Sequence, residues 1–201
     1  MACELRTGFR VRVLVVDEIE ERAEILREGL RQAGCEVAAS LSSPFALLAT
    51  IESQKPDVIV IDTDSPSREV LEHLALVTQR TPRPIVMFAN DGAPTTIRKA
   101  VLAGVSSYVV DGFDPARLGT IVEVAVARFE NFQALRGQLA DANLRLAERK
   151  LVDRAKGLLM KGRSLDEATA YAMLRKMAMD RKLRLAEVAQ RVIDAADLLG
   201  A

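Results

Sequence analysis

The sequence has few of the residues that build disulfide frameworks or zinc sites. Its 201 residues include two cysteines, Cys3 and Cys35, and one histidine. Two cysteines in a chain of this length do not make a disulfide framework, and no CxxC pair or Cys/His cluster is present to bind zinc. This usage fits a reducing compartment, so we expect a cytoplasmic protein.

Long apolar runs are also missing. The N-terminus lacks the apolar stretch of a signal peptide or membrane span, and residues 1–10 are predicted to form a flexible tail. A net charge of one sign is absent as well, because Lys+Arg and Asp+Glu both total 28. The two parts differ, however: residues 1–133 carry 14 basic and 19 acidic side chains, and residues 134–201 carry 14 and 9. The basic C-terminal part favours a polyanion such as nucleic acid, and the alternative is a solvated helix surface.

Short apolar, β-branched runs alternate with helical patterns through the first part of the chain. The predicted strands are Val11–Val16, Glu36–Ser40, Val58–Ile61, Ile85–Ala89 and Ser107–Val110. The predicted helices are Ile19–Ala33, Phe45–Ser53, Arg68–Thr78, Thr95–Ala103 and one that begins at Asp114-Pro115. This alternation predicts an α/β domain over residues 11–128, a flavodoxin-like, doubly wound parallel sheet.

Proline is absent between Arg117 and Met160, so the fifth helix continues beyond this domain. Apolar residues recur along it every seven positions, with others between them: Ala125, Phe132, Leu139 and Leu146, then Leu135 and Ala142. This repeat predicts a coiled-coil linker over residues 129–148 and a homodimer. The alternative is a helix that packs against its own domain.

Residues 149–201 have the pattern of a small three-helix bundle. Gly162 is predicted to end one helix, and Ser164–Glu167 reads as a capping box that opens the next, which runs to about Met179. A last helix is expected from Leu185 to Leu199. The expected core residues are Leu158, Leu159, Leu174 and Ala178.

Three carboxylates, Asp17, Glu18 and Asp62, follow two of the predicted strands. They meet at the carboxyl edge of a parallel sheet, where ligands bind. Clustered carboxylates repel one another unless a cation joins them, so this site predicts Mg²⁺, and one carboxylate could then attack a phosphoryl donor. The alternative is an acidic surface with no such role. No nucleophile–base set is visible elsewhere, so we expect no enzymatic activity and no catalytic residues.

The segments VVDE (Val15–Glu18), IDTDSP (Ile61–Pro66) and AGVSSYVV (Ala103–Val110) resemble the receiver domain of two-component response regulators. The resemblance implies phosphorylation at Asp62 and a switch aromatic at Tyr108. Two switch positions depart from the family pattern: Ala89 replaces a hydroxyl residue and Asp111 replaces a lysine. Both changes remove contacts to a phosphoryl group, so we expect Asp62 to be modified slowly or not at all.

Cations cluster in the C-terminal part, where Tyr171 is the only aromatic residue after Phe132. Cations bind phosphates without regard to sequence, whereas unpaired RNA bases are read by stacking. For Tyr171, base stacking and core packing remain equally open. The predicted RNA-binding set is Arg149, Arg154, Lys156, Gly157, Lys161, Arg163, Tyr171, Arg175 and Lys176.

The segments AKGLLM (Ala155–Met160), Glu167-Ala168, YAMLRKMAM (Tyr171–Met179) and Val188-Ala189 resemble the ANTAR domain, the RNA-binding module of bacterial transcription antiterminators. With a receiver and a coiled coil before it, the chain most resembles the NasT-type regulators of nitrate and nitrite assimilation. That resemblance implies binding to a two-hairpin leader RNA, prevention of terminator formation, and inhibition by a NasS-like nitrate-sensing protein. The alternatives are a DNA-binding response regulator and a protein-interaction module controlled by phosphorylation.

Overall fold

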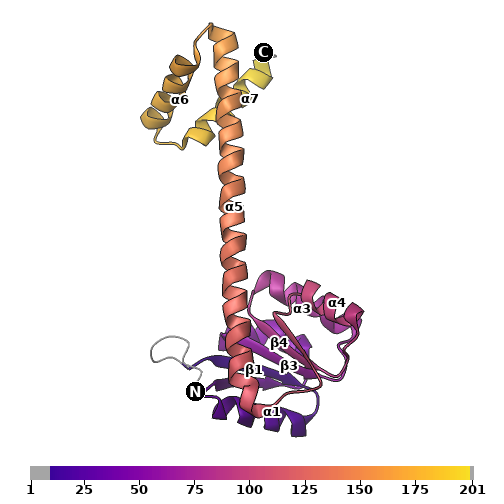
Figure 1. Ribbon diagram of the computed structural model, residues 1–201. Helices are drawn as coiled ribbons and strands as arrows, with labels where there is room; N and C mark the ends of the chain where they lie inside the picture. The colour runs from indigo at the N-terminus through magenta and orange to yellow at the C-terminus, as the bar shows by residue number, and fades with distance from the viewer. Residues whose placement is uncertain (1–9, 200–201) are drawn as a thin grey trace. The chain divides into compact units, whose positions relative to one another are not determined.

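The computed structural model describes residues 10–199, without the side chains of Arg163 and Leu199. The predicted tail therefore lies almost wholly outside the described residues. The chain divides into two compact units, one up to Gln133 and one from Ala134 onward (Figure 1). The narrower boundaries predicted for the linker, 129 and 148, stay predictions.

The N-terminal unit is an α/β domain with five parallel strands, as predicted. The strands are β1 (Arg12–Asp17), β2 (Glu36–Leu41), β3 (Val58–Thr63), β4 (Ile85–Ala89) and β5 (Ser107–Val110), in the order β2-β1-β3-β4-β5. The helices between them are α1 (Glu20–Gln32), α2 (Leu47–Gln54), α3 (Arg68–Arg80) and α4 (Pro94–Leu102). Short 3₁₀ turns, Pro44–Ala46 and Pro115–Arg117, precede α2 and the fifth helix, α5 (Leu118–Arg163).

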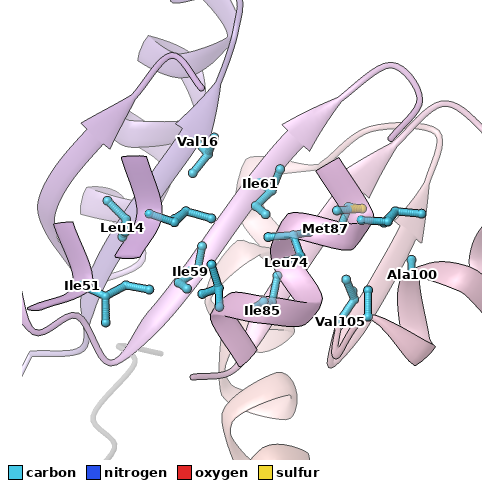
Figure 2. Close-up of a cluster of buried hydrophobic side chains, with 14 residues drawn as sticks. Leu14, Val16, Ile51, Ile59, Ile61, Leu74, Ile85, Met87, Ala100 and Val105 are labelled. Atoms are coloured by element: carbon cyan, nitrogen blue, oxygen red, sulfur yellow. The ribbon is translucent and has the colours of Figure 1, made fainter. Parts of the chain in front are cut away.

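Both faces of the sheet are buried, which explains the unbroken apolar runs of β1 and β3. One face packs against α1 and the start of α5, through residues such as Leu26, Leu30 and Leu118. The other packs against α2, α3 and α4, and Figure 2 shows this cluster, with Leu74 of α3 among Ile59, Ile61 and Ile85 of the sheet. The architecture is therefore doubly wound, with β1 next to β3 at its centre.

Helix α5 (Leu118–Arg163) begins in the core of the N-terminal unit. Ala125 is fully buried there, so its assignment to the coiled-coil stripe was wrong: the first turns of α5 pack on the sheet. The later members of the stripe are exposed in the single chain: Phe132 57%, Leu135 64%, Leu139 62% and Leu146 53%. In the part of the chain that the structure describes, no helix is both long and apolar enough to cross a bilayer.

The C-terminal unit contains the end of α5, α6 (Glu167–Arg181) and α7 (Leu185–Leu199). Ala155 from α5 meets Leu174 and Ala178 from α6 in a core that is closed by α7 residues such as Ile193. Leu158 and Leu159 are partly buried against this core. The predicted three-helix bundle is thereby confirmed.

The turn between α5 and α6 differs from the prediction. Helix α5 continues through Gly162 to Arg163, and Ser164 adopts φ +51°, a left-handed conformation that ends α5. Ser164 therefore cannot cap α6, because an N-cap residue needs extended backbone. Asp166 caps the helix instead, with its carboxylate accepting from the Thr169 N–H at 2.9 Å.

Helix α7 starts at Leu185 although Arg184, at the position before it, has no capping side chain. The carboxylate of Glu187 reaches back and accepts from the Arg184 N–H at 2.8 Å. This is one half of a capping box, which satisfies one backbone donor at the start of the helix.

Candidate functional site

Two of the three predicted acidic residues meet at the edge of the sheet. Asp17 ends β1, and its Cα pairs with that of Asp62 in β3. Both are buried, at 3% and 7% exposure, whereas Glu18 is exposed. Among the described residues, no group of three His, Cys, Asp or Glu side chains is placed to hold a metal ion.

A guanidinium from α1 lies against this acidic pair. Arg22 Nη2 is 3.3 Å from Asp17 Oδ1, and its Nε is 3.6 Å from Asp62 Oδ2. Its Nη1 also donates to Asp64 Oδ1 at 2.7 Å, just past the end of β3. Arg22 therefore brings a positive charge to the place where Mg²⁺ was predicted.

Burial dominates the electrostatics of Asp62. It raises the pKa of Asp62 from its ordinary 3.8 to about 6; Arg22 opposes this shift and the nearby Asp17 adds to it. Asp17 accepts from the Ile19 N–H through Oδ1, while its Oδ2 is buried with no hydrogen-bond donor. An unsatisfied buried carboxylate oxygen suits a hard cation such as Mg²⁺. The donor chemistry thus fits the metal, although Arg22 already supplies positive charge.

A cavity of about 250 Å³ lies beside Arg22, the residue that contacts the acidic pair. Its walls include Glu18, Arg22, Asp64 and the hydroxyl residues Ser65 and Ser67. Arg22 is therefore shared between the buried carboxylates and an accessible, polar space.

The predicted switch residues surround the ends of β4 and β5. Ala89 is buried at the end of β4, so no hydroxyl is available there. Tyr108 donates its hydroxyl proton to the Asp91 carbonyl at 2.7 Å. Asp111 is exposed at φ +66°, and its N–H donates to the Ala89 carbonyl at 3.2 Å. The exposed carboxylate of Asp111 takes the place where the family pattern has a lysine.

Asp91 joins the two loops beside the pocket, a role that no pattern in the sequence indicates. Its Oδ2 accepts from Ser65 Oγ at 3.0 Å and from Thr96 Oγ1 at 2.9 Å, and its Oδ1 accepts from the Ala93 N–H. These bonds, that to Ala93 foremost, lower the pKa of Asp91. The loop that carries the Tyr108 contact is thus held by the protein's own hydrogen bonds.

In the C-terminal unit, three of the predicted RNA-binding cations form ion pairs, and two of these pairs link helices of the bundle. Lys156 bonds Asp153 at 2.9 Å and Glu167 at 2.7 Å, which links α5 to α6. Arg154 Nη2 lies 3.1 Å from Asp197 Oδ1, which links α5 to α7. Both side chains therefore position helices of the bundle. Arg149 is more loosely placed, with its Nε 3.9 Å from the Asp153 carboxylate.

Three more of the predicted residues lie on the outer face of α6. Tyr171 is 43% exposed and lies outside the buried core, so it does not pack in the core. Arg175 lies one turn further along α6 and Lys176 next to it, and both are exposed. Met179, 69% exposed, extends the same face. We call Tyr171, Arg175, Lys176 and Met179 the α6 outer face.

The remaining members of the predicted set lie near the end of α5. Lys161 is exposed; in the part of the chain that the structure describes, neither it, Arg175 nor Lys176 takes part in an ion pair. A Cβ added at Gly157 would meet nothing within 4 Å, so helix packing in the described chain does not require a glycine there. The side chain of Arg163 lies outside the described structure.

Comparison with known families assigns both units. Residues 13–123 match the response regulator receiver domain, and residues 140–193 match the ANTAR domain. The transcriptional regulatory protein PdtaR of Mycobacterium tuberculosis is 31% identical over 183 residues, which cover 91% of this chain and 89% of PdtaR. The chain belongs to the ANTAR-domain response regulators.

Another relative and two solved structures match parts of this ANTAR response regulator. The nitrate regulatory protein of Klebsiella oxytoca is 44% identical over 61 residues, 30% of this chain and 15% of that protein. A LuxR-family response regulator from Aurantimonas, 26% identical, superposes with a TM-score of 0.53, covering 59% of this chain and 86% of that structure. The receiver domain of NarL from Mycobacterium tuberculosis, 19% identical with a TM-score of 0.53, shares the fold over 59% of this chain and 97% of that domain.

In this ANTAR response regulator, the acidic pair can be interpreted from the general properties of receiver domains. Receiver domains generally bind Mg²⁺ in an acidic pocket, and in this chain Asp17 and Asp62 lie next to each other at the edge of the sheet. Regulators with an ANTAR output domain are typically not enzymes. Arg22 and Asp91 were missed because their roles come from tertiary contacts; the only sequence signal for Arg22 was a cation in the first turn of the helix after Asp17.

Proposed function

We propose that this ANTAR response regulator is a transcription antiterminator that binds hairpins in a leader RNA and prevents the terminator from forming. The observation that supports this best is the α6 outer face, where an exposed tyrosine lies one turn from Arg175, next to Lys176; neither cation forms an ion pair with another described residue. An aromatic ring stacks on an unpaired loop base, while neighbouring cations hold the phosphates on either side. The face lies within the segment that matches the ANTAR domain.

The predicted RNA-binding residues would divide into two roles. Lys161, Arg175 and Lys176 would contact phosphates, because their charges are exposed and are not used within the bundle. Arg154 and Lys156 would act by fixing α6 and α7 against α5. Gly157 would allow close approach of RNA, since it has open space around it. Arg149 and Arg163 would add to the electrostatic attraction.

Two such modules would act together in a homodimer. Leu135, Leu139 and Leu146 are all more than half exposed, at coiled-coil spacing along α5. Pairing of this stripe with a second copy would remove apolar surface from water and place two ANTAR units side by side. Two units suit a leader RNA with two hairpins.

The target genes would be those of nitrate or nitrite assimilation. This rests on the segment similar to the Klebsiella nitrate regulatory protein and on the resemblance to NasT-type regulators. A NasS-like nitrate sensor would then hold the regulator inactive. Phosphorylation of Asp62 would have a minor part, because Ala89 and Asp111 cannot make the usual contacts to a phosphoryl group. Mg²⁺ would enter the acidic pocket only in competition with Arg22.

Binding to hairpin RNA and to duplex DNA at the same salt concentration tests the proposal. Wild-type protein is expected to prefer a hairpin from a nitrate-assimilation leader, and preference for duplex DNA would favour the alternative of a DNA-binding response regulator. Failure to bind any hairpin at low salt would favour a protein-interaction module.

Variants of the α6 outer face sharpen this test. The double variant R175A/K176A is expected to lose about tenfold or more in RNA affinity and to flatten the salt dependence by about one unit of slope per cation. Y171A is expected to lose a similar factor, while Y171F keeps its ring and most of its affinity. R191A, an exposed arginine of α7, is the matched control. An unchanged affinity in R175A/K176A and Y171A would contradict the assignment of this face.

A further inference from the structure

The acidic pocket of the receiver domain contains a cation that belongs to the chain itself. Arg22 extends from the first turn of α1 and contacts Asp17, Asp62 and Asp64 at 3.3, 3.6 and 2.7 Å. Its own side chain is 28% exposed, whereas those of Asp17 and Asp62 are 0% and 8% exposed. The guanidinium therefore offsets part of the negative charge of two carboxylates that are shielded from water.

This arrangement is looser than a closed ion-pair network. Arg22 Nε and Asp17 Oδ2 are both buried without a hydrogen-bond partner. Buried charged groups with unsatisfied hydrogen-bonding atoms cost free energy. Arg22 alone therefore does not satisfy all the hydrogen-bonding atoms of the pocket. The pocket retains an unfilled acceptor that a smaller, harder cation could use.

The outer end of Arg22 is held by a surface residue. Asp64 is 69% exposed and accepts from Arg22 Nη1 and, at 3.0 Å, from Asn90 Nδ2 through the same oxygen. Asp64 thus fixes the guanidinium to the loops after β3 and β4. The 250 Å³ cavity that Arg22 lines offers space into which the side chain can move once this contact is broken.

We propose that Arg22 is an internal competitor of divalent metal in this receiver domain, with Asp64 as the latch that holds it over Asp17 and Asp62. In the latched state the positive charge beside the carboxylates comes from Arg22, and metal occupies the pocket only after Arg22 leaves. Arg22 therefore gives the pocket a low intrinsic affinity for Mg²⁺. This inference does not depend on RNA binding.

Calorimetric titration of MgCl₂ into the full-length protein tests the proposal, together with thermal unfolding at several MgCl₂ concentrations and constant ionic strength. R22Q is expected to bind Mg²⁺ at least about tenfold more tightly than wild type, because a charge-assisted competitor is gone. Its melting temperature is expected to rise with Mg²⁺, while that of wild type stays nearly constant. R27Q is the matched control, since Arg27 is on the same helix and its ion pairs with described residues are those with Glu20 and Glu24. Equal Mg²⁺ affinity in wild type and R22Q would overturn the proposal.

D64N is a second, milder variant that does not expose the buried pair. If Asp64 is the latch, D64N is expected to increase Mg²⁺ affinity, because Arg22 is released more easily. If Asp64 instead acts as a metal ligand or has no part, D64N reduces the affinity or leaves it unchanged, and either result contradicts the proposal. The double variant R22Q/D62N is expected to lose the gained affinity, which places the metal at Asp62.

Discussion

At the scale of single residues, the sequence predicts only part of the environment of Asp62, and tertiary packing determines the rest. Its place at the end of β3 predicts a neighbour at the end of β1, and Asp17 is that neighbour. The sequence does not show how deeply both are buried, nor that Arg22 reaches them, because these depend on how α1 packs over the sheet. The result is a carboxyl group whose pKa is raised to about 6.

This raised pKa predicts an unusual pH dependence of stability. The folded state binds the Asp62 proton more tightly than the unfolded state, so the stabilisation is fully present below pH 3.8 and is lost as the pH rises through about 6. In buffer with EDTA, the free energy of unfolding of wild type is expected to fall between pH 4 and pH 7 by about 2 kcal/mol more than that of D62N, after a discount for solvent screening. Denaturant unfolding of both proteins at each pH measures this difference. Parallel pH profiles would show that Asp62 titrates normally.

At the scale of secondary structure elements, the strands and helices of the receiver domain follow from the sequence almost residue by residue. Buried parallel strands leave unbroken apolar runs, and the helices between them carry an apolar stripe. The turn before α6 was misjudged because Ser164, Asp166 and Glu167 all suit a capping role by composition. Only the backbone decides among them, and Ser164 is in the left-handed region.

The reassigned cap can be tested by native-state hydrogen exchange. D166A is expected to increase exchange in the first turn of α6 by about fivefold, because the Thr169 N–H loses its acceptor. S164G is expected to leave exchange unchanged or slow it, since glycine adopts positive φ without strain. Faster exchange in S164G than in D166A would restore Ser164 as the cap.

At the scale of the whole molecule, the sequence predicts the order of the parts, and both domain families were recognised. The α6 outer face could be anticipated only in part, since the sequence left Tyr171 equally open to core packing. The apolar stripe of α5 was predicted to begin too close to the start of the helix. Ala125 packs in the receiver core, and the exposed members of the stripe come after it.

Leu139 lies on this stripe, whereas Leu144 is similarly exposed, at 55%, but lies off the seven-residue repeat. These two leucines provide a matched pair for testing dimerisation.

L139R is therefore expected to sediment as a monomer and L144R to behave as wild type, because only the first places a charge in the paired stripe. The proposal that paired ANTAR units bind paired hairpins is tested most directly by measuring RNA affinity across both variants. The two RNAs are a nitrate-assimilation leader with two hairpins and the same leader with one hairpin replaced by an unstructured strand of equal length. Wild type and L144R are expected to lose roughly 100-fold in affinity on removal of one hairpin, and L139R to bind both RNAs alike. An equal loss in wild type and L139R would contradict binding by paired units.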